Sequence, residues 1–445
     1  LADYLVASGE DKPDMTLEVL YDGKKQKEVM IDGSNLFSFD NKFVLFGDAM
    51  FRAWRDAAGF TSVNNTYLAQ LGHRYPWFVT KPSAVIPFGA AASDFTVART
   101  HADIARLSSV PWLGSFIDAG VLSDAGDPQR YIATIAQSGL TLPKDYYINE
   151  GEPYVTVRGL LKTYIYETLK RAGISRPDAR AQRIFDLEMA IARLHWSTQQ
   201  RRDSVAMYRV MTPTELKAFA PGYEWDTYLK ARGFSQASKI NVTTSTAVQG
   251  LAKLFAETPV DLLKDHMTFH LLSATSDSLS EEWQQARFDF FERKLQGIGE
   301  MRALENRAVA STNKDMGTQI GKIYVQRHFL PEHRAQVQSM VDYMRQSFAD
   351  RIGKLDWMDA PTKQEALKKL SMVSSHIGYP DRWQDFSSVI IKPDDLMGNQ
   401  KRLAIWVRAD ELKKLGETRR DWEWPYAPQE VNAGYVTSLN SITFP

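Results

Sequence analysis

The stretch DARAQRIFDLEMAIARLHW, residues 178–196, decides the fold class of this chain. Its apolar residues Ile184, Leu187, Ile191 and Leu194 recur at intervals of three and four, so they share one face of a helix. Similar spacing runs through the long middle of the sequence. The pattern predicts a mainly α protein.

A second long helix is predicted for PEHRAQVQSMVDYMRQSFADRI, residues 331–352, which opens on a proline suited to the first helical position. Its apolar residues are spaced to share one face: Val337, Val341, Met344, Phe348 and Ile352. We expect this face to be buried.

Two further helices are predicted from capping boxes, in which a hydroxyl precedes a carboxylate by three residues. The pairs are Ser278 with Glu281 and Thr362 with Glu365. We expect Gly297 to end the first helix and Gly378-Tyr379-Pro380 to end the second.

Strand signals are confined to the two ends of the chain. MTLEVLY (15–21) and KKQKEVMI (24–31) flank Asp22-Gly23, a pair that favours a tight hairpin turn. KPSAVIPFGAAASD (81–94) is typical of a loop. Alternation returns near Trp424, with Val431, Ala433 and Tyr435 expected on one side of a strand.

The composition excludes several classes of function. Lys plus Arg equals Asp plus Glu, 54 against 54, which argues against a general nucleic-acid binder. No apolar run reaches the roughly 20 residues that span a bilayer, so we expect no membrane span. Because the chain has no cysteine, thiolate catalysis and thiolate zinc sites are excluded.

Of the 8 histidines, only His266 and His270 have a spacing that suggests a metal. In DHMTFH they lie four apart on one helix face, with Asp265 as a possible third ligand. A zinc peptidase of the H-E-x-x-H type needs a glutamate after the first histidine as general base, and Met267 stands there. Helix packing is therefore the preferred interpretation, and the residues alone form no complete catalytic constellation.

Four dispersed stretches resemble the neprilysin-like family of zinc metallopeptidases, its bacterial members in particular, over roughly residues 100–445. They are SGLTLPKDYYI (138–148), LHWSTQQRRD (194–203), WMDAPTKQEALKKLSMVSSHIGYPDRW (357–383) and WPYAPQEVNAGYVTSLNSITFP (424–445). In that family a mostly helical lobe closes over a thermolysin-like α+β catalytic lobe and leaves a chamber for small peptides.

The resemblance implies a division of the chain into three parts. Residues 1–100 stay unassigned and partly β, residues 101–400 form the helical lid domain, and residues 401–445 begin the catalytic lobe with its C-terminal strands. The family's Zn²⁺ ligands and catalytic residues lie beyond the position of Pro445. We therefore expect no catalytic and no metal-binding residue in this chain, and no activity from it alone.

The resemblance assigns substrate binding to Asn432 and Ala433. In the family this pair lies on the edge strand of the active-site cleft, where an extended peptide can add itself as a further strand. The amide of Asn432 offers both a donor and an acceptor to a peptide group. The family usually has an aromatic residue next, whereas this chain has Gly434, which would loosen the strand or mark a bulge.

Two hypotheses follow. The first is a portion of a zinc endopeptidase that cleaves small peptides in a closed chamber, with its catalytic segment beyond Pro445 or on a separate chain. The alternative is a non-catalytic, peptide-binding helical module related to the family. Leu1 in place of an initiator Met fits a removed signal peptide or a trimmed sequence, and we expect a periplasmic or secreted protein rather than a cytoplasmic one.

Overall fold

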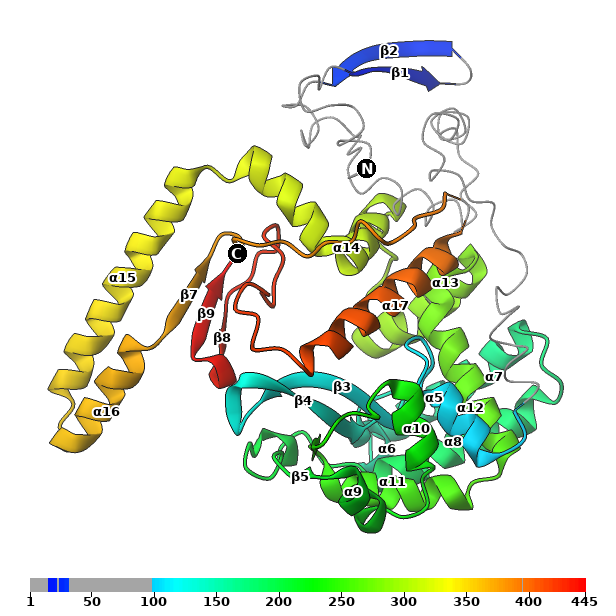
Figure 1. Ribbon diagram of the computed structural model, residues 1–445. Helices are drawn as coiled ribbons and strands as arrows, with labels where there is room; N and C mark the ends of the chain where they lie inside the picture. The colour runs from blue at the N-terminus through cyan, green and yellow to red at the C-terminus, as the bar shows by residue number, and fades with distance from the viewer. Residues whose placement is uncertain (1–14, 22–23, 32–97, 394) are drawn as a thin grey trace.

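The computed structural model describes residues 15–21, 24–31, 98–393 and 395–445, and Figure 1 shows their arrangement. Near the N-terminus, β1 (Met15–Tyr21) and β2 (Lys24–Ile31) pair antiparallel, as the sequence predicts. The predicted turn at Asp22-Gly23 and the predicted loop at residues 81–94 lie outside the described residues.

Helix α8 (Pro177–Leu194) confirms the helix predicted from the opening stretch. Ile184 and Ile191 are fully buried, and Leu187 is nearly so. The helix packs against α7 (Tyr154–Arg171) and α12 (Val260–Thr275) to form the centre of a helical lobe. The mainly α fold is therefore confirmed.

The rest of this lobe is built around a four-stranded sheet with the order β3-β4-β6-β5. Its strands are β3 (Ile117–Asp124), β4 (Asp127–Gln137), β5 (Val210–Met211) and β6 (Ile240–Val242). The surrounding helices are α5 (His101–Ser108), α6 (Lys144–Ile148), α9 (Pro213–Phe219), α10 (Trp225–Arg232), α11 (Ser245–Glu257) and α13 (Glu281–Phe288). The sheet and helices α5, α9, α10 and α11 share a buried core that includes Ile135, Val242 and Phe255.

The second part of the molecule is an arm of long helices beside a small sheet (Figure 1). The helices are α14 (Leu304–His328), α15 (Pro331–Lys354) and α16 (Ala360–Ser371). The sheet has the order β7-β9-β8, with β7 (Ser374–Ile377) parallel and β8 (Gly434–Val436) antiparallel to the central β9 (Ser441–Phe444). Helix α17 (Leu396–Lys414) runs between this sheet and the helical lobe.

Both predicted capping boxes are wrong. The hydroxyl of Ser278 donates to the side chain of Gln400 on α17 instead of capping α13, so a tertiary contact displaces the local one. Helix α16 starts earlier than predicted, because Asp359 is its N-cap and accepts from the backbone N–H of Thr362.

The predicted helix stops have different outcomes. Gly297 adopts a φ of +73° where the helical run beginning with α13 ends, which confirms that prediction. Gly378 does not end α16, because the chain passes first through β7. It lies instead directly after that strand.

The predicted face of α15 is not buried by the described residues. Val341 is 1% exposed, but Phe348 is 59% exposed and Met344 is 43% exposed. Neighbouring Met340 and Tyr343 are also exposed. We name Met340, Tyr343, Met344 and Phe348 the α15 apolar face.

The predicted division at residues 100 and 400 stays a prediction. Residue 400 lies inside α17, so one continuous helix joins the two sides of the second boundary. Among the described helices, none has both the length and the apolar character needed to cross a membrane.

Candidate functional site

Asn432 and Ala433 lie directly before β8 rather than inside a strand. The prediction that strand structure returns near Trp424 is therefore wrong for residues 424–433. A long-range contact explains this, because the side chain of Gln429 donates to the backbone carbonyl of Gly317 on α14 at 2.9 Å. Residues 424–433 are thus hydrogen-bonded to α14 before the chain enters β8.

The surroundings of Asn432 leave it accessible. Both Asn432 and Ala433 are exposed, and they lead into β8, which is an edge strand paired with β9 alone in the described part of the chain. The side-chain oxygen of Asn432 accepts from the backbone N–H of Ala433 at 2.8 Å. No hydrogen bond of its NH₂ group is recorded within the described residues, which leaves two donors available.

Packing explains why position 434 is a glycine, which the sequence alone did not show. A Cβ at this position would lie 2.5 Å from the hydroxyl oxygen of Tyr426, so no larger residue fits unless that ring moves. Gly434 still pairs with Thr443 in the regular register of β8 and β9. The expected bulge at Gly434 is therefore absent from this strand pair.

A buried cluster of Glu188, His266 and His270 is the group in the described residues whose ligand types could hold a metal ion. Glu188 comes from α8 and the two histidines from α12, so the pair predicted to share a helix face does so. The carboxylate of Glu188 accepts from the hydroxyls of Thr141 and Tyr147, each at 2.6 Å, and from Nε2 of His270 at 2.8 Å.

The electrostatics of this cluster follow from its burial. Burial alone would raise the pKa of Glu188, but the hydrogen bond and nearby charge of His270 hold that pKa below its usual value. Burial, together with the nearby charge of His270, lowers the pKa of His266 to about 3. Nε2 of His266 donates to the carbonyl of Gly139 at 3.0 Å, so the neutral ring carries its proton there.

These bonds do not fit a zinc site at the Glu188, His266 and His270 cluster. The oxygens of Glu188 already accept from three donors, and Nε2 of His266 is occupied by Gly139. A metal would have to displace these bonds, and Met267 offers no general base beside His266. The cluster is a hydrogen-bond network joining α8, α12, α6 and the segment before α6, as the helix-packing interpretation expects.

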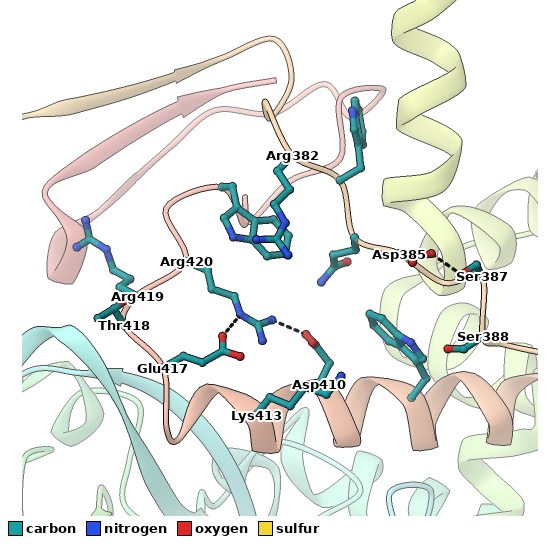
Figure 2. A pocket seen from close by; sticks show the side chains of 14 residues that line it. Arg382, Asp385, Ser387, Ser388, Asp410, Lys413, Glu417, Thr418, Arg419 and Arg420 are labelled. Atoms are coloured by element: carbon teal, nitrogen blue, oxygen red, sulfur yellow. Dashed lines mark hydrogen bonds and ion pairs between the residues drawn. The ribbon is translucent and has the colours of Figure 1, made fainter.

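A pocket of about 860 Å³ opens beside α17 (Figure 2). Trp406, Asp410 and Lys413 recur at intervals of four and three on α17, so they share the face that lines it. The loop after β7 contributes residues within 382–388, and the loop after α17 contributes residues within 417–422. We name this space the α17 pocket.

An ion-pair network centred on one arginine lines part of the pocket. Arg420 forms ion pairs with Asp410 at 2.7 Å, Glu417 at 2.6 Å and Glu423 at 2.8 Å, the first two drawn in Figure 2. The hydrogen bond to Glu417, together with those to Asp410 and Glu423, raises the pKa of Arg420 above its usual value. The network fixes the loop after α17 onto the helix.

Sequence reasoning missed Glu188 and the pocket, although each left a signal. Glu188 lies on the apolar stripe of α8, between Leu187 and Ile191, where an acidic residue indicates a buried carboxylate. Trp406, Asp410 and Lys413 have helical spacing, but their partners come from loops that periodicity does not place.

Comparison with known proteins identifies a family for most of the chain. Residues 44–380 match the family model described as Peptidase family M13. Neprilysin-2 of Drosophila melanogaster is 29% identical over 356 residues, which cover 74% of this chain and 46% of that relative. Endothelin-converting enzyme 1 of Rattus norvegicus is 27% identical over 348 residues, covering 74% of this chain and 45% of the relative.

Solved structures show the same relationship. The zinc metalloprotease Zmp1 of Mycobacterium tuberculosis, in complex with an inhibitor, gives a TM-score of 0.78 at 27% identity and covers 93% of this chain and 60% of its own. PepO of Lactobacillus rhamnosis gives a TM-score of 0.73 at 20% identity, covering 90% and 62%, and supports the fold alone. The chain spans less than half the length of the two curated relatives described above.

Proposed function

This chain belongs to peptidase family M13, and we propose that it is the lid-bearing portion of a zinc-dependent endopeptidase that cleaves small peptides in a closed chamber. Asn432 and Ala433 hold the substrate backbone in this proposal. The catalytic segment lies beyond Pro445 or on a separate chain in this proposal.

The exposed approach to edge strand β8 carries the proposal. A peptide laid beside this edge meets backbone groups that have no partner in the described residues, and it can pair with them as an added strand. The NH₂ group of Asn432 can donate to a peptide carbonyl, while Ala433 leaves room for the peptide backbone to approach.

This chain is expected to cleave no peptide by itself. Its sequence has no H-E-x-x-H motif, and the Glu188 cluster does not fit the metal. Polarisation of the scissile carbonyl and activation of water would come from zinc held by residues outside this sequence. The part of the reaction assigned to this chain is binding and orientation of the peptide.

The α15 apolar face is consistent with contact to a large partner. Met340 is 63% exposed, Tyr343 73% and Phe348 59%, which together form a concentration of exposed apolar side chains on one helix. Because the matched relatives are more than twice as long as the region they share with this chain, the catalytic segment is the proposed cover. A periplasmic or secreted location also belongs to this proposal, and fractionation of producing cells tests it.

A protein extended through the catalytic segment tests the function. We expect it to contain about one zinc per chain and to cleave a short unstructured peptide, and a chelator to abolish cleavage. Full activity after complete removal of metal would refute the proposal. An extended protein that binds the peptide but never cleaves it would instead favour the non-catalytic peptide-binding module.

The role of Asn432 is tested in the same protein by Asn432→Ala. Loss of one or two hydrogen bonds to the peptide, each of about 1 kcal/mol, predicts a fall in kcat/KM of roughly tenfold. Asn149→Ala, at an exposed position directly after α6, is a control that should change nothing. Unchanged peptide kinetics for Asn432→Ala would remove this residue from the substrate site.

A further inference from the structure

The α17 pocket contains two cations that its ion-pair network does not use. Arg420 is neutralised by Asp410, Glu417 and Glu423. Arg382 and Lys413 also line the pocket, and neither forms an ion pair within 4.0 Å among the described residues. Both residues are exposed, so each can offer its charge to a bound molecule.

Arg382 is held in place by an aromatic ring rather than by a carboxylate. Its guanidinium lies 4.5 Å from the ring centre of Trp422, whose ring is also 5.6 Å from the guanidinium of Arg420. Stacking of this kind orients the group but leaves its N–H donors at the rim of the plane, where a carboxylate can accept two of them. Arg382 is therefore oriented while its hydrogen-bonding capacity remains available.

The opposite wall supplies apolar surface. Trp406 of α17 lines the pocket and packs edge-on against Phe386, with ring centres 4.0 Å apart. Trp383 lines the pocket from the same loop as Arg382. The pocket thus combines aromatic walls with a few charged groups, which is the usual make-up of a site for a small molecule or a peptide side chain.

We propose that the α17 pocket is an accessory binding site for an acidic segment of the peptide substrate, with a carboxylate held by Arg382 and Lys413 and a neighbouring apolar side chain packed on Trp406. This rests on the proposed function in that the ligand is a peptide substrate. Figure 2 shows Arg382 and Lys413 approaching from opposite sides, one from the loop and one from α17. The site selects among peptides by charge, separately from the backbone contacts at Asn432.

A nucleic acid fits the same pocket less well. Its wall also carries Asp385, Asp410 and Glu417, and these carboxylates would face a run of phosphates. A single carboxylate needs only the local charge of Arg382 and Lys413. The equal numbers of basic and acidic residues in the chain, 54 each, agree with this choice.

The test is binding of fluorescein-labelled peptides to the full chain, measured by anisotropy. The probe contains Glu-Leu in a neutral background, and the comparison peptide contains Gln-Leu at the same place. We expect the Glu peptide to bind about tenfold more tightly, and Arg382→Gln and Lys413→Gln each to remove most of that difference. Amidated and free C-termini of both peptides distinguish a side-chain carboxylate from a terminal one.

Matched controls isolate the pocket. Arg202→Gln and Lys253→Gln remove exposed cations elsewhere on the helical lobe and should leave the tenfold preference intact. Equal binding of the Glu and Gln peptides to the wild-type chain would overturn the proposal, and so would a preference that survives the double substitution of Arg382 and Lys413. Dependence on the free C-terminus alone would also overturn it, because the side-chain carboxylate would then have no role.

Failure here is distinguishable from failure of the proposed function. Cleavage of the Gln peptide by the extended protein, with zinc bound, depends on the function alone and requires no acidic residue. If that cleavage occurs and the Glu peptide shows no advantage, the endopeptidase proposal stands and the accessory site falls.

Discussion

Replacement of Glu188 by glutamine tests how much the buried network stabilises the helical lobe. The carboxylate is fully buried and accepts from Thr141, Tyr147 and His270. Glutamine keeps the shape of the side chain but replaces one oxygen by an NH₂ group. At least one of the three donors then loses its acceptor oxygen.

The magnitude follows from these contacts. A hydrogen bond to a charged group contributes about 1.5–3 kcal/mol, and a buried donor left without an acceptor costs a further 1–3 kcal/mol. Glu188→Gln is therefore expected to lower the free energy of unfolding by about 2–4 kcal/mol. Urea unfolding at pH 7, followed by near-UV circular dichroism, measures this loss.

Glu282→Gln is the matched control. Glu282 pairs with Arg171 at 2.8 Å, but its side chain is 71% exposed, so the pair contributes well under 1 kcal/mol. If Glu188→Gln unfolds within about 0.5 kcal/mol of the wild-type chain, the assigned network energy is wrong. If added zinc stabilises the wild-type chain but not this variant, the cluster binds metal and is no closed network.

Two further predictions concern the same lobe. Burial lowers the pKa of His266 to about 3 and of His195 to about 4, below the unfolded value of about 6.5, so stability present above pH 6.5 is lost as the pH falls. Each histidine should contribute a loss of about 2 kcal/mol between pH 7 and pH 5, and His266→Gln should reduce the pH dependence seen in urea unfolding by about that amount. An undiminished pH dependence would contradict this assignment. Gly222 has a φ of +105°, and a Cβ there would lie 2.8 Å from the carbonyl oxygen of Ala252, so Gly222→Ala should cost about 2–3 kcal/mol. Gly151→Ala, with a φ of +79° and open space around it, should cost about 1 kcal/mol, and equal shifts in melting temperature would show that the contact with Ala252 adds nothing.

Helical periodicity was the most reliable guide to the fold. The stripe of Ile184, Leu187 and Ile191 is buried because α7 and α12 pack on it, so the local pattern and the tertiary contacts agree. The same pattern on α15 predicted its helix correctly but not its burial. Burial depends on what covers a face, and periodicity carries no information about that partner.

Caps and loops were harder to predict for a different reason. Ser278 had a plausible local partner in Glu281, yet its hydroxyl bonds to Gln400, which lies far away in the sequence. Asn432 and Ala433 were placed in a strand by alternation, but the anchoring of Gln429 to α14 keeps the chain out of the sheet until Gly434. In both cases a long-range hydrogen bond prevails over a local tendency of similar strength.

The strand order of the small sheet has a consequence for biosynthesis. The backbone of β7 pairs with β9. The backbone N–H groups of Ser374 and Gly378 therefore have no acceptor until Asn440 and Phe444 have left the ribosome. At roughly 5–20 residues per second, the delay lasts several seconds. The helices and the sheet of the helical lobe precede β7 in the sequence and are translated first, so the nascent chain carries them tethered to an unpaired strand. During that interval β7 presents unpaired backbone groups to which another strand could add itself.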